Sequence, residues 1–168
     1  MRERLHRLFL YLRDPEHMRR ADLLSKNPLF EGLPHGTIGR LLPRMFEKQY
    51  EPGDVVFRSG DPGRGLFIVL DGEVEIVRQI GEDAEMRLAV YGGNTAFGEL
   101  ALIDDHPRAA TARVLKPTRM LILYRSDFDS ISAGDPRAAM ALARNLLRVL
   151  ARYARSAATH PRVDSKAS

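Results

Sequence analysis

The spacing of hydrophobic and polar positions changes along the chain, and each change predicts a different kind of element. Residues 2–12 place their leucines on one helical stripe, which predicts a short amphipathic helix. A second helix is expected to begin at Asp14, a good N-cap residue followed by a proline, and to end near Ser25. Another short helix is expected over residues 35–42.

From Met45 to about Tyr124 hydrophobic and polar residues alternate with a period of two residues, which is typical of β-strands. The run Glu73 to Ile76 shows this alternation clearly. Glycines and prolines separate the short runs. Many short strands divided by such turns predict an antiparallel barrel of the double-stranded β-helix, or jelly-roll, kind. A single helical turn is expected to interrupt the strands near residue 100.

Two helices are expected after the strands. Arg125 opens a short one, with Ser126 or Asp127 as its N-cap, and Asp135 before a proline begins a long one. The long helix has an apolar stripe formed by Met140, Ala143, Leu147, Leu150 and Ala154, with Leu146 and Val149 alongside. Its expected solvent-exposed face carries Arg144, Arg148, Arg152 and Arg155.

The predicted fold class is therefore mainly β with flanking helices. We expect an N-terminal helical segment over residues 1–44 and a β-barrel over residues 45–124. Residues 125–157 would form C-terminal hinge and lid helices. Residues 158–168 have no periodicity and few large apolar side chains, so a disordered tail is expected there.

Composition narrows the functional classes. The 168 residues suit one domain with extra helix, and the absence of cysteine excludes disulfides and thiolate chemistry. No apolar run approaches the roughly 20 residues that span a bilayer, and the run at residues 8–12 is too short for a signal peptide. A cytoplasmic location is expected. The histidines lack metal-ligand spacing and no serine lies in a nucleophile elbow, so neither a metal site nor an enzyme is predicted.

Charge is unevenly distributed behind the net value of +4. The segment 51–136 is acidic, whereas residues 1–50 and 137–168 are basic. Arginines on solvated helix surfaces are the simpler interpretation. Basic ends that contact nucleic acid, anionic lipid or an acidic partner are the alternative.

One segment concentrates residues that suit a sugar phosphate. It reads Phe97-Gly98-Glu99-Leu100-Ala101-Leu102, followed by Pro107-Arg108-Ala109-Ala110-Thr111. A helical turn that starts at Gly98 would direct unpaired N–H groups at an anion, and Arg108 offers a planar fork for phosphate oxygens. Ionised Glu99 only accepts hydrogen bonds, so it suits a sugar hydroxyl rather than a phosphate. The alternative is an ordinary salt bridge between Glu99 and Arg108.

This segment resembles the phosphate-binding cassette of the cyclic nucleotide-binding domain family, which includes regulatory subunits of cAMP-dependent protein kinase, catabolite activator proteins and cytosolic domains of cyclic nucleotide-gated channels. The resemblance covers roughly residues 28–156 and includes the earlier runs 52–57, 60–63 and 66–74. The family's usual Gly-Asp before the cassette is replaced by Asn94 and Thr95. Asparagine tolerates a left-handed backbone, so we expect the turn to be kept.

The resemblance implies that Glu99 holds the ribose 2′-hydroxyl and Arg108 the cyclic phosphate, with Gly98, Leu100, Ala101, Ala110 and Phe97 around them. Ala109 lacks the threonine hydroxyl that often reaches guanine in relatives selective for cGMP, so cAMP is expected before cGMP. Leu88 and Phe57 would form apolar walls near the base, although core packing explains both equally well. No cofactor is implied beyond this ligand.

The long last helix would supply a lid over the base. The lid candidates are Val149, Leu150, Arg152 and Tyr153, which lie at about the right separation from Arg108. A dimer seam or a barrel contact explains the same stripe equally well, and homodimerisation through this helix does not exclude the lid.

The predicted function is that of a cytosolic receptor for a cyclic nucleotide, whose last helix moves and signals to an effector protein or a second copy. Only a short tail follows that helix, so no DNA-binding domain and no nucleic-acid partner are expected. A scaffold protein on the same fold, with basic terminal helices that contact a partner, is the alternative. A cyclic dinucleotide is a third option, which Glu99 disfavours because it suits a free ribose hydroxyl.

Overall fold

The computed structural model describes residues 14–82 and 84–159. The helix predicted over residues 2–12 and all but the start of the predicted tail lie outside these ranges. The helical elements are α2 (Pro15–Ser25), η1 (Pro28–Phe30), α3 (His35–Leu41), η2 (Leu42–Arg44), η3 (Glu99–Leu102), α4 (Arg125–Gly134) and α5 (Pro136–Thr159). The strands are β1 (Phe46–Tyr50), β2 (Val55–Phe57), β3 (Gly65–Gln79), β4 (Glu85–Tyr91), β5 (Ala96–Phe97) and β6 (Thr111–Tyr124).

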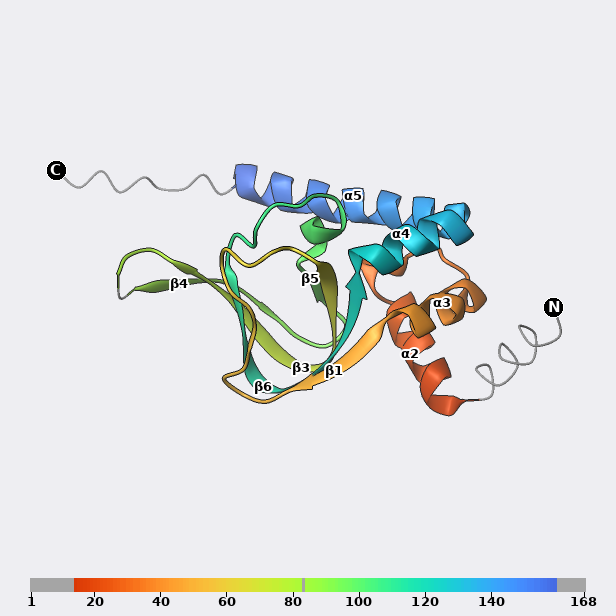
Figure 1. The fold of residues 1–168 in the computed structure, drawn as a ribbon, viewed down its shortest axis with the longest axis horizontal. Helices are drawn as coiled ribbons and strands as arrows, with labels where there is room; N and C mark the ends of the chain where they lie inside the picture. The colour runs from red at the N-terminus through yellow and green to blue at the C-terminus, as the bar shows by residue number, and fades with distance from the viewer. Residues whose placement is uncertain (1–13, 83, 160–168) are drawn as a thin grey trace.

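The strands curl into an antiparallel barrel with helices at one end and along one side (Figure 1). In the view of Figure 1, α2, α3 and α4 gather at the right-hand end, and α5 runs across the top. The hairpin that ends in β4 projects at the opposite end. The predicted fold class, mainly β with flanking helices, is confirmed.

Two long strands organise the sheet. β3 and β6 pair antiparallel from Gly65 opposite Tyr124 to Val77 opposite Thr111. β1 and β2 add to β6, and β4 and β5 add to β3, so the sheet order is β1-β6-β3-β4. The register is irregular around Asp71 and Glu73. Gly72 lies in this bend with φ of 100°, and a Cβ there would come within 2.4 Å of the Pro117 carbonyl oxygen, so the close crossing requires glycine.

The barrel wall separates two hydrophobic clusters. Alternate residues of β3 point to opposite sides: Leu66 and Ile68 join the helices, whereas Phe67 and Val69 fill the barrel interior. β6 does the same with Leu121 and Met120. Because both faces are covered, residues 65–69 form a continuous buried run instead of an alternating one.

The caps that the sequence predicts explain the starts of α2 and α5. The Asp14 side chain accepts a hydrogen bond from the Glu16 amide, and Asp135 accepts one from the Ala138 amide. The predicted cap of α4 is wrong: the helix begins at Arg125, its N-cap residue is Tyr124, and no side chain caps it. α5 runs to Thr159, two residues beyond the predicted boundary.

The predicted apolar stripe of α5 is not its buried face. The buried residues are Ala138, Ala139, Leu142, Asn145, Leu146 and Val149. Met140 and Leu147, both in the predicted stripe, are 71% and 63% exposed. Helix α5 therefore has an inner face against the core and a separate outward apolar row. Of the helices in the described ranges, none combines the length and hydropathy that a bilayer-spanning segment needs.

Candidate functional site

Stacked aromatic rings fix the start of the cassette (residues 97–111). Phe97 pairs with Phe67 across β5 and β3, and the two rings stack with centroids 5.4 Å apart. The Tyr91 ring stacks on the other side of Phe97 at 5.4 Å. Each such aromatic pair contributes about 0.5–1.5 kcal/mol beyond the area it buries. The chain therefore leaves the barrel core at a defined point before it turns into η3.

The turn itself depends on Gly98. Its φ of 74° lies in the left-handed region, and it is the N-cap of η3 without a side-chain capping bond. The predicted helical turn after Gly98 is thus present, and its residues Glu99, Leu100 and Ala101 line the cavity described below. A Cβ on Gly98 would meet Arg108 Nη1 at 2.7 Å. The Arg108 guanidinium therefore takes the space that a side chain at this position would need.

Arg108 is held by the backbone and by an aromatic ring. Its Nη1 donates to the Gly98 carbonyl at 3.0 Å and its Nη2 to the Gly65 carbonyl at 2.7 Å. The guanidinium carbon lies 4.2 Å from the centre of the Phe57 ring, a cation–π contact. Phe57, predicted as a wall near a base, therefore lies beneath the arginine. The Nε of Arg108 is buried and has no hydrogen-bond partner.

The backbone of Arg108 is equally constrained. Its amide donates to the Asp61 carbonyl at 2.8 Å, and its carbonyl accepts from the Gly60 amide at 2.9 Å. The loop between β2 and β3 thus pins the arginine from below. At the other end of the cassette, Arg125 donates to the carbonyls of Ala101 and Gly63, both at 2.7 Å. The 97–111 segment is therefore anchored at both ends to the barrel and to the start of α4.

Glu99 is a buried carboxylate, 8% exposed, next to this cation. Burial raises the pKa of Glu99, and a hydrogen bond from its own backbone amide and the charge of Arg108 only partly oppose that rise. Burial also lowers the pKa of Arg108, against the charges of Glu99 and Asp61. No ion pair joins Glu99 to Arg108 in the part of the chain that the structure describes. The ordinary salt bridge that the sequence left open is not formed.

Both side chains line one cavity of about 420 Å³. The cavity is lined by Phe57, Ile76, Tyr91, Phe97, Gly98, Glu99, Leu100, Ala101, Asp104, His106, Pro107, Arg108, Ala109 and Ala110. The predicted ligand residues are all among them except Leu88, which is 40% exposed on β4 and lines neither cavity described here. Leu88 lies at a register irregularity between β3 and β4, because Ile76 pairs with Ala89 and Val77 pairs with Arg87.

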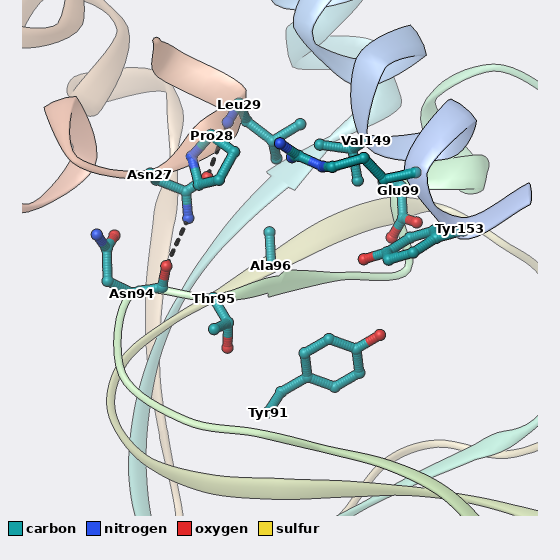
Figure 2. Close-up of a pocket in the computed structure, with 11 residues that line it drawn as sticks. Asn27, Pro28, Leu29, Tyr91, Asn94, Thr95, Ala96, Glu99, Val149 and Tyr153 are labelled. Atoms are coloured by element: carbon teal, nitrogen blue, oxygen red, sulfur yellow. Dashed lines mark hydrogen bonds between the residues drawn. The ribbon is translucent and has the colours of Figure 1, made fainter. Parts of the chain in front are cut away.

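A second, smaller cavity of about 160 Å³ lies between the end of α5, η1 and the turn before β5 (Figure 2). It shares Tyr91 and Glu99 with the first cavity. Three of the lid candidates, Val149, Arg152 and Tyr153, line it. The fourth, Leu150, packs instead against the cluster between the helices and the barrel.

Tyr153 brings α5 to the edge of the site. Figure 2 shows its ring beside the Glu99 carboxylate, across the cavity from Tyr91. Burial raises the pKa of Tyr153, and so do the negative charge of Glu99 and the interaction with the Tyr91 hydroxyl. Burial likewise raises the pKa of Tyr91. The two phenols stay protonated near neutral pH and can each donate a hydrogen bond.

The sequence analysis missed several lining residues. Tyr91 and Ile76 come from strands β4 and β3, and Asp104, His106 and Pro107 from the loop within the cassette. Tyr91 precedes two glycines at the end of a predicted strand, but this position alone carries no functional signal. Asn94 was expected to keep a left-handed turn, and its φ of 59° confirms this.

The site can bind an anion and a neutral hydroxyl group at once. Two of the five N–H groups of Arg108 are used by backbone carbonyls, which leaves three for a ligand. Glu99, when ionised, offers only acceptors. Across the described ranges, no cluster of three or more His, Asp or Glu side chains is placed to hold a metal ion.

Comparison with known proteins gives a consistent picture. A family model described as "Cyclic nucleotide-binding domain" matches residues 47–135. The CRP-like cAMP-activated global transcriptional regulator of Mycobacterium tuberculosis is 31% identical over 134 residues, which are 80% of this chain and 58% of that protein. The chain spans less than two thirds of the length of curated relatives that it matches.

Solved structures of other proteins share this fold. The N-terminal domain of a transcriptional regulator from Streptomyces coelicolor is 35% identical with a TM-score of 0.72, and the match covers 78% of this chain and 94% of that one. The regulatory domain of Toxoplasma gondii PKA, crystallised with cAMP, is 31% identical with a TM-score of 0.63 and covers 72% of this chain and 46% of that one. The Glu99 and Arg108 cavity thus lies in a fold shared with cAMP-regulated proteins.

Proposed function

This chain belongs to the cyclic nucleotide-binding domain family, and from that premise we propose that it is a receptor for a cyclic nucleotide, cAMP before cGMP. The observation that carries the proposal is the cavity of about 420 Å³ in which Glu99 and Arg108 face the same space without pairing with each other. A buried carboxylate and a half-buried guanidinium that stay apart are costly in a ligand-free fold, because each keeps part of its desolvation penalty. A ligand with an anion at one edge and a hydroxyl at the other relieves both.

The cyclic phosphate binds Arg108 in this proposal. The N–H groups of its terminal nitrogens that do not donate to the Gly98 and Gly65 carbonyls are available to the phosphate. The ribose 2′-hydroxyl donates to Glu99. Ala109 and Ala110 line the same cavity and leave room for the phosphate near their amides.

The base lies against Ile76 and Tyr91 in this arrangement. Ala109 has no hydroxyl to offer to guanine, which supports adenine as the base. Tyr91 supplies one hydroxyl at the base end of the cavity and accepts or donates according to the partner it meets. cGMP therefore remains a weaker ligand rather than an excluded one.

Helix α5 transmits the signal. Val149 and Tyr153 already lie at the edge of the site, beside Glu99 (Figure 2). A ligand on Glu99 adds contacts to Tyr153 only while α5 stays close, so binding favours the closed position of the helix. In this proposal the signal then passes to an effector protein or to a second copy of the chain.

We also propose that two copies pair through the outward row of α5. Its apolar residues follow a spacing of three and four, and they are Met140, Ala143, Leu147, Leu150 and Ala154, of which Leu150 also packs partly against the core cluster. This spacing is that of a coiled-coil seam, and a helix that meets a second copy of itself buries the row on both sides. The exposure of Met140 and Leu147 in the single chain supports the pairing.

Isothermal titration of the purified full chain with cAMP tests the ligand. We expect a saturable one-site isotherm with cAMP, weaker binding of cGMP and much weaker binding of linear 5′-AMP, whose dianionic phosphate does not fit the ring-shaped anion site. Absence of heat and of a thermal shift with either cyclic nucleotide at hundreds of micromolar would overturn the proposal. Salt-sensitive binding to nucleic acid or anionic vesicles without nucleotide would favour the scaffold function instead.

A further inference from the structure

Two buried asparagines join the elements around the smaller cavity. Asn27 is 1% exposed and connects η1 to the turn before β5. Its Nδ2 donates to the Asn94 carbonyl at 2.9 Å, and its Oδ1 accepts from the Leu29 amide at 3.0 Å (Figure 2). One amide side chain thus caps η1 and holds the turn that leads into the cassette.

Asn145 makes the matching connection from α5. It is also 1% exposed, and it lies one helical turn before Val149 on the inner face. Its Nδ2 donates to the Leu29 carbonyl at 3.0 Å and to the Glu31 carbonyl at 2.8 Å. The same amide therefore binds the middle residue of η1 and the residue that follows this element, and its Oδ1 accepts a hydrogen bond from Arg148 at 3.0 Å.

These bonds form an unbroken path from the cassette to the last helix. The path runs from Asn94 through Asn27 and Leu29 to Asn145, and thus passes through an element far earlier in the chain than either end. The carbonyl of Leu29 and its amide are both used, one by each asparagine. We propose that Asn27 and Asn145 are positioning residues that make η1 the mechanical link between the ligand site and α5.

The energetics favour a link that moves as one body. Loss of either amide leaves buried carbonyls without a donor, which costs about 1–3 kcal/mol for each group. The cavity of about 160 Å³ means that Leu29, Ala96 and Val149 are not in continuous close packing there. Space on one side and fixed hydrogen bonds on the other allow η1 and α5 to shift together against the barrel. The role of this link in signalling rests on the proposed function, whereas the hydrogen-exchange experiment below tests the link itself without a ligand.

Hydrogen exchange on the ligand-free full chain tests the link directly. The probes are the amides of Asn94, which donates to the Val69 carbonyl, and of Val69, which donates to the Thr95 carbonyl. Asn145→Leu removes the two donors with little change of volume. Asn27→Ser keeps a cap for Leu29 but is too short to reach Asn94. Leu142→Ala is the control, because it removes only apolar contacts from the same face of α5.

The amide of Val114 on β6 is the reference. We expect Asn145→Leu to speed hydrogen exchange at the amides of Asn94 and Val69 by at least fivefold relative to this reference, whereas Leu142→Ala should change the exchange rates of all three amides alike. The double variant of Asn27 and Asn145 should exchange no faster at Asn94 than Asn27→Ser alone, because the two bonds act in series. Equal effects of Asn145→Leu and Leu142→Ala at the turn, or additive effects of the two asparagine variants, would overturn the link.

A second measurement connects the link to ligand binding. The chain contains no cysteine, so spin labels attach cleanly at Gln49→Cys on β1 and Arg144→Cys on α5. With cAMP, the label separation should change in the parent protein and change by less than half as much in Asn27→Ser, while binding persists. An unchanged response in Asn27→Ser would contradict the inference. If the parent protein fails to bind cAMP, the proposed function fails, and the exchange experiment still decides the link.

Discussion

The guanidinium of Arg108 occupies the place where a side chain at Gly98 would lie. Nη1 of Arg108 bonds the Gly98 carbonyl at 3.0 Å, and it would stand only 2.7 Å from a Cβ on that residue. The left-handed backbone of Gly98 and the position of the arginine are therefore one structural requirement. The two residues are ten positions apart in the sequence, and together they set the shape of the site.

Gly98→Ala should damage both stability and binding. A left-handed alanine costs about 1–2 kcal/mol, and its Cβ also displaces the guanidinium. Denaturant unfolding and titration with cAMP measure the two losses. Gly134→Ala is the matched control, because its Cβ would meet nothing within 4 Å and its backbone is not left-handed. Equal behaviour of the two variants would argue against the role of Gly98.

Arg108→Ala should weaken cAMP binding by at least tenfold. Hydrogen bonds to a charged partner contribute about 1.5–3 kcal/mol, and 1.4 kcal/mol corresponds to tenfold in affinity. Titration calorimetry checks this, with the exposed Arg64→Ala as the control for loss of a positive charge. Unchanged affinity in Arg108→Ala would place the phosphate elsewhere.

Glu99→Gln should stabilise the ligand-free protein while it weakens binding. The pKa of Glu99 is raised by burial, so above its ordinary value of 4.5 the folded state binds more protons than the unfolded state. The free energy of unfolding then falls as pH rises through that window. Glutamine removes this pH dependence. In urea titrations, the gain in free energy of unfolding of Glu99→Gln over the parent protein should therefore grow from about pH 4 to neutrality and vanish below about pH 4. An advantage that is independent of pH would contradict the assignment.

Glu75→Gln should destabilise the barrel in a way that depends on pH in the opposite direction. Burial opposes ionisation of Glu75, but hydrogen bonds from Arg113 at 2.8 Å and Arg87 at 2.7 Å outweigh it and lower the pKa. The stabilisation is thus present above pH 4.5 and lost as pH falls through the lowered value. We expect a deficit of about 1–3 kcal/mol at pH 7 that shrinks in acid. Chemical denaturation of the parent protein and of Glu75→Gln at pH 7 and in acid measures this deficit.

Leu147→Glu should prevent pairing of two copies without unfolding the chain. The residue is 63% exposed, so the variant places a charge on the outward row of α5 and leaves the core intact. Sedimentation velocity should show a dimer in the parent protein and a monomer in the variant. Ala133→Glu adds the same charge to an exposed position of α4 and should remain dimeric. A monomeric parent protein would exclude the seam.

Local signals in the sequence predict the elements of this fold well. Asp14 and Asp135 stand before prolines, and the helices begin where those caps place them. Gly98, Glu99 and Arg108 are close in sequence, and the structure brings them to one cavity. These features depend on neighbouring residues, which a sequence displays directly.

Non-local contacts explain what the sequence did not reveal. Glu75 belongs to an alternating strand and is expected to be exposed. In the structure, arginines from β4 and β6 cover it, and only 3% of its surface is exposed. Helix α5 has apolar residues on two faces, and its periodicity alone does not decide which face meets the core. Tyr91 enters the site only because β4 folds back beside β5. Each of these outcomes depends on pairing between distant segments.

The fixed guanidinium has a consequence for timing. Two carbonyls and the Phe57 ring hold Arg108 in place before any anion arrives, so first capture requires no rearrangement of that side chain. In the proposed function, diffusion into the cavity would then set the rate of capture, and the slower opening of α5 would set the rate of release. Such a receptor would respond promptly to a rise in its messenger and retain the signal after the messenger falls.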